Sequence, residues 1–245
     1  MDQSELFSAA EVIRNSRYLI ALTGAGISKE SNVPTFRGAD GLWRNHDAME
    51  LATPDAFRRN PTLVWEWYTW RQGLIAECNP NPGHLTLAKW ERENLLKSLL
   101  TQNVDGLHIR AGSKNVWEVH GDLWALKCVV CDYKGRLEAP AVGIPLCPEC
   151  SNSLRPDVVW FGESLDRDVI SNVHSELEQA DVCLVIGTSA LVQPAASFPL
   201  IVQQRGGFII EVNVERTPLT SAADYHLSGK SGEVLPELDE ILHSK

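Results

Sequence analysis

The residues with the clearest chemistry in this sequence are two pairs of cysteines, Cys128 with Cys131 and Cys147 with Cys150. Two C-x2-C pairs can supply four thiolates to one tetrahedral zinc ion. Since the protein would fill all four ligand positions, we expect a structural zinc that stabilises a loop too short to have its own core. A zinc ribbon that binds nucleic acid is the alternative, but acidic residues outnumber basic ones between the first and last cysteine.

His120, in "VWEVHGDLW", is the candidate acid–base residue. It ends a short apolar, strand-like stretch, and Gly121 after it leaves the imidazole ring unobstructed. Histidine is the side chain best suited to accept a proton near neutral pH. A structural role is the alternative for a single histidine in this setting. The surroundings of the other histidines indicate no special role.

Two polar stretches follow apolar runs and could bind a nucleotide. The first, "GAGIS" at 24–28, brings glycines to a strand end, where backbone N–H groups can approach phosphates. The full dinucleotide fingerprint needs a third glycine where Lys29 stands, so a plain tight turn is the alternative. The second, "TQNVDGLH", places Gln102, Asn103 and Asp105 together, and such groups can bind ribose hydroxyls and a carboxamide. An Asx-type turn at Gly106 is the alternative there.

The segment "LVWEWYTWRQGLI" at 63–75 raises the question of why an arginine stands among aromatic residues. On a helix, Val64, Tyr68, Arg71 and Ile75 lie on one stripe, with the phenol and the guanidinium as i, i+3 neighbours. Their polar ends could converge on one ligand. The alternative is that Arg71 extends past the aromatic rings into water.

These motifs lie at the ends of apolar runs that alternate with helical stretches. The runs are Tyr18–Leu22 and the apolar parts of "LLKSLLTQNVDGLH", "ADVCLVIGTSA" and "GFIIEVN". Buried strands alternating with helices predict an α/β fold with a doubly wound parallel sheet, which binds ligands beyond the carboxyl ends of its strands. Two segments break the alternation, a helical, tryptophan-rich one at 36–83 and the cysteine module at 126–154.

Composition limits the classes of partner. The chain has 32 acidic against 22 basic residues and a net charge of −10, without a Lys/Arg cluster, so no direct nucleic-acid binding is expected. The N-terminus lacks a secretory signal and no apolar run approaches a membrane span, so we expect a cytoplasmic protein without a membrane partner. In such a chain the paired cysteines indicate metal rather than disulfides. Cys183, in an apolar run, is expected in the core.

Taken together, these residues resemble the sirtuin family of NAD-dependent protein deacylases. The resemblance extends from about Leu19 to Leu238 and includes, in order, "GAGIS", "PTFRGADGLW", "TQNVDGLH", "VHGDL", the two CxxC pairs, "LRPDVVWFGE", "GTSALVQPAA", "EVN" and "GKSGEVLPEL". It implies a Rossmann-like NAD-binding domain over 1–35, 84–125 and 155–245. The smaller domain would combine the helical insert at 36–83 with the zinc-binding module at 126–154.

The resemblance also implies how the site residues act. His120 would be the general base on a ribose hydroxyl, while the acyl-lysine oxygen attacks the ribose C1′ carbon and nicotinamide leaves. NAD would be a consumed co-substrate, which suits the missing third glycine. The residues implied to contact NAD are Gly24, Ala25, Gly26, Ile27, Ser28, Phe36, Arg37, Trp43, Gln102, Asn103, Val104, Asp105, Gly187, Thr188, Ser189, Asn213 and Ser231. The strand implied to pair with the substrate backbone is Val158, Val159, Trp160 and Phe161, a form of β-augmentation.

A class III, desuccinylase-like subset of the family resembles this chain in an "ATP" motif followed by Y-x-x-R, here Ala52, Tyr68 and Arg71. Succinyl- and malonyl-lysine end in a carboxylate, which is costly to bury without a partner. A guanidinium can bind it bidentately, the phenol can donate to it, and alanine leaves room for the longer acyl chain. We therefore predict an enzyme that removes succinyl or malonyl groups from acylated lysines of proteins or peptides, with acetyl removal left open.

Three alternatives remain. One is a deacetylase without preference for acidic acyl groups, one is an NAD-dependent protein ADP-ribosyltransferase, and one is a zinc-ribbon adaptor without activity. Two positions depart from the family pattern. Asp157 stands where glycine is usual, which could alter the substrate strand, and Ser231 stands where alanine is usual, with little effect expected.

Overall fold

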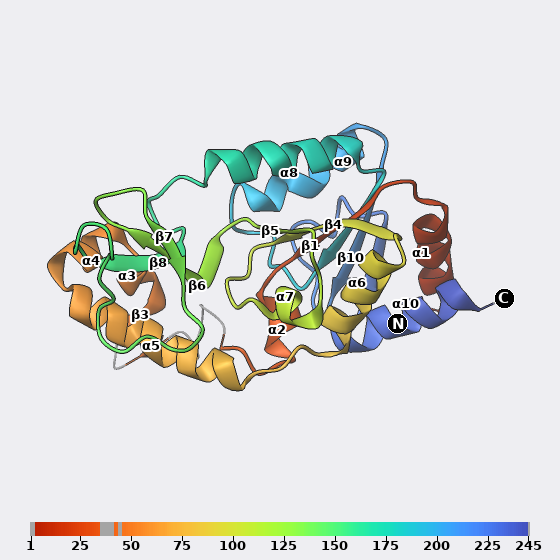
Figure 1. The fold of residues 1–245 in the computed structure, drawn as a ribbon. Coiled ribbons are helices and arrows are strands. Elements are labelled where there is room, and N and C mark those ends of the chain that lie inside the picture. The colour runs from red at the N-terminus through yellow and green to blue at the C-terminus, as the bar shows by residue number, and fades with distance from the viewer. Residues whose placement is uncertain (1–2, 35–41, 44–45, 245) are drawn as a thin grey trace.

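The computed structural model describes residues 3–34, 42–43 and 46–244. The described residues form a main sheet of six parallel strands in the order β11-β10-β9-β1-β4-β5 (Figure 1). These strands are β1 (Leu19–Thr23), β4 (Leu96–Thr101), β5 (Val116–Glu118), β9 (Val182–Ile186), β10 (Phe208–Asn213) and β11 (Tyr225–Ser228). The predicted α/β fold with a parallel sheet is confirmed.

Helices cover both faces of this sheet (Figure 1). On one face lie α1 (Gln3–Asn15), α6 (Pro82–Arg92) and α10 (Ser231–His243); on the other lie α8 (Arg167–Gln179) and α9 (Phe198–Gln204), which follows a short 3-10 turn at Ala195–Ser197. The strands are apolar on both sides because each side is covered: Leu19 and Ala21 of β1 join the first core, and Ile20 and Leu22 join the second. This is the doubly wound arrangement that the sequence predicts.

Several helices begin where the sequence provides a cap. Asn81 starts α6 with a capping box in which its side chain accepts from the backbone of His84 while the His84 ring accepts from the Asn81 N–H. Asp166 accepts from two backbone N–H groups at the start of α8. Asn60 caps the tryptophan-rich helix, and Pro61 occupies its first position, where a missing N–H costs nothing.

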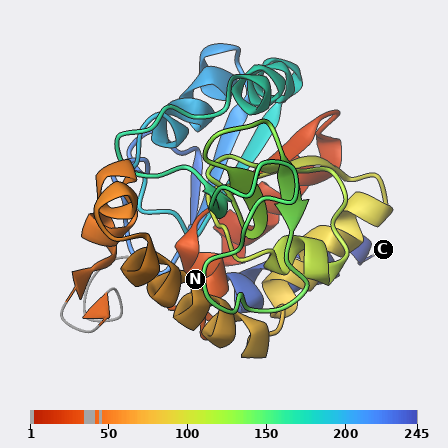
Figure 2. The same cartoon turned by 60° about the vertical axis from the view of Figure 1, so that its left-hand side comes forward.

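A smaller body lies at one end of the molecule (Figure 1). It contains β2 (Leu42–Trp43), β3 (His46–Asp47), α3 (Ala48–Leu51), α4 (Pro54–Arg59), α5 (Pro61–Glu77) and an antiparallel sheet of β6 (Gly121–Cys128), β7 (Lys134–Arg136) and β8 (Leu154–Val158). In Figure 2 the green cysteine module comes forward beside the orange helices α4 and α5. Trp65, Trp67 and Tyr68 of α5 share one core with Leu126 and Leu154 of the module, so neither part buries its apolar side chains alone. The domain boundaries given by the resemblance, with the smaller domain at 36–83 and 126–154, remain predictions.

The strand order determines where the motifs meet. Strands β10, β9, β1 and β4 are neighbours, so the four polar clusters that follow them lie along one edge of the sheet. From β1 the chain adds strands in one direction through β4 and β5, and it then returns to place β9 on the other side of β1. A crevice at such a switch point is where doubly wound sheets bind ligands. Short helices α2 (Ala25–Lys29) and α7 (Leu107–Ala111) begin at this edge.

Among the described residues, none of the helices combines the length and the apolar character that crossing a membrane would require.

Candidate active site

The glycines of "GAGIS" pack against the turn that follows β9. Gly24 N–H donates to the Ile186 carbonyl, and Gly26 N–H donates to the Gly187 carbonyl at 2.7 Å. A Cβ on Gly26 would lie 2.6 Å from the Gly187 Cα, and a Cβ on Gly24 would lie 2.8 Å from the Thr188 Cα. Glycine is therefore required for a backbone-to-backbone approach at the switch point, which brings together two of the predicted NAD-binding loops.

The second polar stretch fastens these loops together. Asn103 is buried, and its Nδ2 donates to the Gly24 carbonyl and to Ser28 Oγ, both at 3.0 Å. Gln102 Nε2 donates to Thr188 Oγ1 at 3.1 Å, across to the turn after β9. Both amides therefore link predicted NAD-binding residues from different strands. Amides, hydroxyls and a carboxylate gathered at parallel strand ends form a donor and acceptor set that fits a dinucleotide.

Asp105 adopts the Asx-type turn that the sequence left open as an alternative. Its Oδ1 accepts from the Leu107 N–H at 2.9 Å, and Gly106 between them has a left-handed φ of 75°. Burial raises the pKa of Asp105, and the charge of Arg71 acts against this rise. The Asp105 carboxyl is therefore buried in the loop after β4, where it is close enough to Arg71 for the two groups to affect each other's pKa.

His120 lies just after β5, beside the Gln102 backbone. Its Nδ1 is 3.0 Å from the Gln102 carbonyl oxygen. Since a carbonyl only accepts hydrogen bonds, Nδ1 carries the proton and Nε2 presents a lone pair. Burial lowers the pKa of His120, so the ring is neutral at pH 7. A neutral imidazole with one nitrogen fixed and the other basic can accept a proton.

The remaining predicted NAD residues are distributed as follows. Asn213 at the end of β10 donates through Nδ2 to the Thr188 carbonyl at 2.9 Å, which ties a third strand end to the same turn. Ser189 and Ala25 are exposed, whereas the Val104 and Ile27 side chains are buried. Trp43 lies in β2, and Phe36 and Arg37 lie outside the described residues.

The predicted residue Ser231 begins α10 and is buried. Its hydroxyl donates to Glu30, and the Gly232 N–H donates to the same carboxylate at 3.1 Å. Glu30 follows the "GAGIS" helix by one residue, so the departure from alanine at position 231 adds a bond between α10 and the end of the glycine loop. The sequence indicated no role for Glu30.

Two buried histidines beneath the site were missed in the sequence. The rings of His84 and His108 lie 4.8 Å apart, and His108 Nε2 is 2.9 Å from Thr23 Oγ1. Burial lowers the pKa of His84 to about 4 and that of His108 well below its usual value. They come from α6 and α7, so only the packing of these helices brings them together; no spacing in the sequence could have indicated the pair.

The four paired cysteines form one cluster, as predicted. Their Sγ atoms all lie within 4.8 Å of one another, with Cys128 and Cys150 at 3.4 Å and Cys131 and Cys147 at 3.5 Å. Sulfurs bound to one zinc at about 2.3 Å would be separated by about 3.8 Å. Backbone N–H groups also point at Cys128 Sγ, as suits a thiolate. The donor set fits a closed metal site, and Cys183 is fully buried elsewhere, as expected.

Tyr68 and Arg71 lie on the buried side of α5. Arg71 is 2% exposed and Tyr68 is 0% exposed, so the interpretation in which the arginine extends into water is excluded. Burial lowers the pKa of Arg71 to about 10, which leaves it charged at pH 7. Its guanidinium lies 5.6 Å from the Trp67 ring and donates to the Pro34 carbonyl at 3.4 Å.

Comparison with known proteins decides the family. The family model described as "Sir2 family" matches residues 24–194, more than half of the chain. The chain belongs to the Sir2 family. An NAD-dependent protein deacylase of Archaeoglobus fulgidus is 53% identical over 240 residues, with 97% of this chain and 96% of that protein covered. The predicted family and class of enzyme are confirmed: the protein is an NAD-dependent protein deacylase.

Solved Sir2 structures have the same fold. A crystal structure of a Sir2 homologue in complex with NAD superposes with a TM-score of 0.93 at 50% identity, covering 98% of this chain and 94% of that one. A Sir2 protein bound to an acetylated peptide superposes with a TM-score of 0.86 at 31% identity, with 98% of each chain covered.

In this Sir2 enzyme the predicted substrate strand uses its N–H groups internally. Val159 N–H donates to the His120 carbonyl, Phe161 N–H donates to the Ala52 carbonyl, and Trp160 N–H donates to Glu163, each at 2.9 Å. Pairing with a substrate backbone through this strand would therefore use carbonyl oxygens. The same bonds tie the predicted base, the predicted acyl-pocket wall at Ala52 and the strand to one another.

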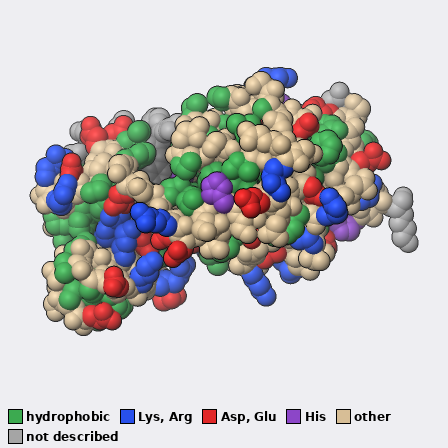
Figure 3. Space-filling model, turned by 90° about the horizontal axis from the view of Figure 1, so that it is seen from above, with side chains coloured by type: hydrophobic (Ala, Val, Ile, Leu, Met, Phe, Trp, Pro, Cys, Tyr) green, Lys and Arg blue, Asp and Glu red, His purple; other side chains and the backbone are tan. Residues whose placement is uncertain are grey.

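Asp157, the other departure from the family pattern, points to the small sheet. Its carboxylate lies 2.9 Å from Lys127 Nζ and 3.7 Å from Lys134 Nζ. In Figure 3 basic and acidic side chains gather together over the left-hand part of the molecule, at the smaller body. The aspartate thus offsets local lysine charge in the enzyme.

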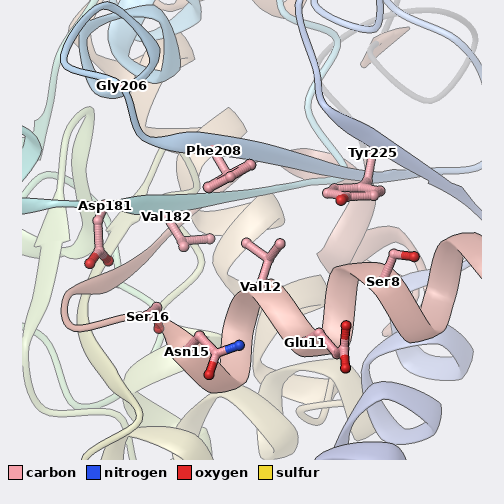
Figure 4. Close-up of a pocket in the computed structure, with 10 residues that line it drawn as sticks. All are labelled: Ser8, Glu11, Val12, Asn15, Ser16, Asp181, Val182, Gly206, Phe208 and Tyr225. Atoms are coloured by element: carbon pink, nitrogen blue, oxygen red, sulfur yellow. The ribbon is translucent and has the colours of Figure 1, made fainter.

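A separate surface pocket lies at the opposite edge of the main sheet. It is lined by α1 and by residues at the starts of the strands, such as Val182, Phe208 and Tyr225 (Figure 4). It is remote from the carboxyl ends of the strands, where His120 and the glycine loops lie.

Proposed function

We propose that this Sir2 enzyme removes succinyl and malonyl groups from protein lysines, with NAD consumed and nicotinamide released. The observation that carries the proposal is a charged, buried guanidinium, Arg71, beside a buried phenol, Tyr68, on one turn of α5. The methyl end of an acetyl group can neither accept a hydrogen bond nor pair with a charge, so it would interact specifically with neither side chain.

The energetics of burial support an acidic ligand at Arg71. Removing a guanidinium from water is costly unless anions and hydrogen-bond acceptors offset the loss. In the free enzyme, the charge of Asp105 and the face of Trp67 contribute to this. The carboxylate at the tip of a succinyl or malonyl group adds a partner that a guanidinium binds bidentately. Acetyl-lysine has no such group.

The phenol can act as a donor to the same carboxylate. Burial raises the pKa of Tyr68 to about 12, so the hydroxyl keeps its proton at any physiological pH. Ala52 is also buried, at the end of α3, and its carbonyl binds the strand that contains Trp160 and Phe161. Its small side chain is proposed to leave room for the longer acyl chain.

His120 is proposed as the general base, with Nε2 as the atom that accepts a proton from a ribose hydroxyl. Bonding of Nδ1 to the Gln102 carbonyl keeps the ring in the tautomer that this role needs. The loops joined by Gln102, Asn103 and Asn213 are proposed to hold NAD, which supplies the electrophilic ribose carbon.

The cysteine cluster is proposed to hold one structural zinc. Its four sulfurs lie close enough for a single ion, and one of them, that of Cys147, is buried. The cluster lies in the core that also contains Tyr68 and Trp160. We therefore propose that the metal supports the acyl pocket through packing and does not take part in the chemistry.

A deacetylase without acidic preference is the second candidate, and the likeness to a Sir2 protein bound to an acetylated peptide favours it. The two are separated by nicotinamide release with one peptide carrying acetyl-, malonyl- or succinyl-lysine. We expect kcat/KM to be higher for the two acidic acyl groups than for acetyl. A higher value for acetyl would support the second candidate.

A further inference from the structure

One hydrogen bond joins the acyl pocket to the substrate strand. The indole Nε1 of Trp160 donates to the hydroxyl oxygen of Tyr68 at 2.7 Å, and both side chains are buried. This bond links α5 to the segment after β8, two parts of the chain that are 92 residues apart. It is a short bond between two buried side chains, where hydrogen-bond geometry is tightly held.

The bond constrains where the phenol proton can point. An indole N–H is a donor only, so the Tyr68 oxygen must accept from it and cannot donate to it. Arg71, one helical turn away, is also a pure donor. The phenol proton is therefore directed away from Trp160 and needs an acceptor of another kind. The carboxylate of an acidic acyl group is such an acceptor.

Trp160 is itself rigidly held. The Arg155 guanidinium stacks on its ring, with Cζ 3.3 Å from the ring centroid, and Phe57 packs with its ring 5.3 Å away. Arg155 binds both carboxylate oxygens of Glu163, at 2.6 and 2.9 Å, and Glu163 also accepts the Trp160 backbone N–H. The indole therefore has one orientation, fixed from its face and from its backbone.

We infer that Trp160 is a positioning residue for acyl selectivity, which aims the Tyr68 hydroxyl at the carboxylate of the substrate. The inference rests on the proposed recognition of acidic acyl groups by Tyr68 and Arg71. Under this inference, acyl selectivity depends on Trp160, a residue that does not touch the acyl carboxylate. The Arg155–Glu163 ion pair holds Trp160 in place, because Arg155 stacks on the indole ring.

The test is a double-mutant cycle with Trp160→Phe, Tyr68→Phe and the double variant, assayed on succinyl- and acetyl-lysine peptides. Losing one neutral, oriented hydrogen bond is expected to lower kcat/KM for the succinyl peptide about fivefold. The loss should appear in KM, and the ratio of succinyl to acetyl kcat/KM should fall by about the same factor. In the Tyr68→Phe background, Trp160→Phe should add nothing further. Equal losses on both peptides, or additive losses in the double variant, would overturn the inference.

Trp65→Phe is a matched control. Trp65 lies in the same core, but its indole donates to the Leu154 carbonyl at 2.9 Å and not to the phenol. Removing this N–H should change both peptides alike. A selective loss of succinyl turnover in Trp65→Phe would overturn the inference, because it would show that selectivity follows core packing in general.

A second measurement needs no tryptophan variant. The Trp160 indole N–H should exchange slowly with solvent in the wild type and faster in Tyr68→Phe; equal exchange would overturn the inference.

Arg71→Met distinguishes a failure of this inference from a failure of the proposed function. If Arg71→Met spares succinyl turnover, the proposed function and the inference both fail. If Arg71→Met lowers it while Trp160→Phe does not, only the inference fails.

Discussion

The proposed NAD site at the strand ends and the proposed acyl pocket are built in different ways. At the strand ends, backbone contacts dominate: Gly26 bonds to Gly187, and Asn103 binds a backbone carbonyl. In the acyl pocket, side chains from distant segments meet, with Arg71 and Tyr68 on α5 and Trp160 after β8. Few substitutions are compatible with the close backbone contacts at the strand ends. In the proposed acyl pocket, single side chains can be replaced without moving the backbone.

Reactivity and acyl selectivity should therefore be separable by mutation. Changes at the strand ends should affect every acyl substrate alike, because all would share NAD and the proposed base. Changes to the polar groups of the proposed acyl pocket should affect acidic acyl groups most, because only these have a carboxylate that loses a partner.

The largest effect is expected at the strand ends, from His120→Ala. Removing the proposed base should lower kcat about 10²- to 10⁴-fold for acetyl- and succinyl-lysine alike. NAD binding, measured by calorimetry, should persist. His174→Ala, which changes an exposed histidine on α8, should leave turnover unchanged. Near-normal nicotinamide release from His120→Ala would remove its role as base.

Removal of the proposed zinc should lower turnover on every substrate, although the metal is remote from the chemistry. The cysteine module and α5 share one core, so loss of the metal should loosen both. Metal analysis of native protein should find one zinc per chain. Cys150→Ser should lose the metal, whereas Cys183→Ala should keep it. A metal-free native protein with full activity would contradict the structural site.

Arg71→Met should separate the two regions most clearly. Loss of a charge-assisted contact of about 3 kcal/mol should lower kcat/KM for succinyl-lysine about 10²-fold. Acetyl-lysine should lose far less. Arg71→Lys keeps the charge without the bidentate geometry and should lie between the two. Equal losses on both peptides would contradict the specificity claim.

A smaller, shared effect is expected from pH. His120 must be neutral to accept a proton, and burial lowers its pKa below 6.5. The activity is therefore retained as the pH falls to 6.5 and lost below it, about tenfold per unit once the folded-state pKa is passed. The acid limb of kcat/KM should be the same for acetyl and succinyl peptides. An acid limb above pH 6.5 would contradict a buried, neutral base.

Much of the fold could be predicted because its signals are local. Apolar runs such as the one containing Cys183 are continuous where both faces of the sheet are covered. The four cysteines could be predicted to meet because their spacing suits one metal. Strand order was not readable in detail: that β8 pairs with β6 rather than joining the parallel sheet depends on long-range packing.

The roles of site residues were harder to predict from the sequence wherever a side chain could have two different roles. Asp105 could form an Asx turn or bind a ligand from its sequence alone, and the structure shows the turn. Arg71 could be solvated or buried, and only the packing of α5 against the module excludes solvation. Glu30 could not be assigned from the sequence, because its partner Ser231 is 201 residues away.

The most direct test of the central claim is the structure of the enzyme with a succinyl-lysine peptide. We expect the terminal carboxylate within about 3 Å of the Arg71 guanidinium nitrogens and of the Tyr68 hydroxyl. A carboxylate turned away from both side chains and toward solvent would contradict it.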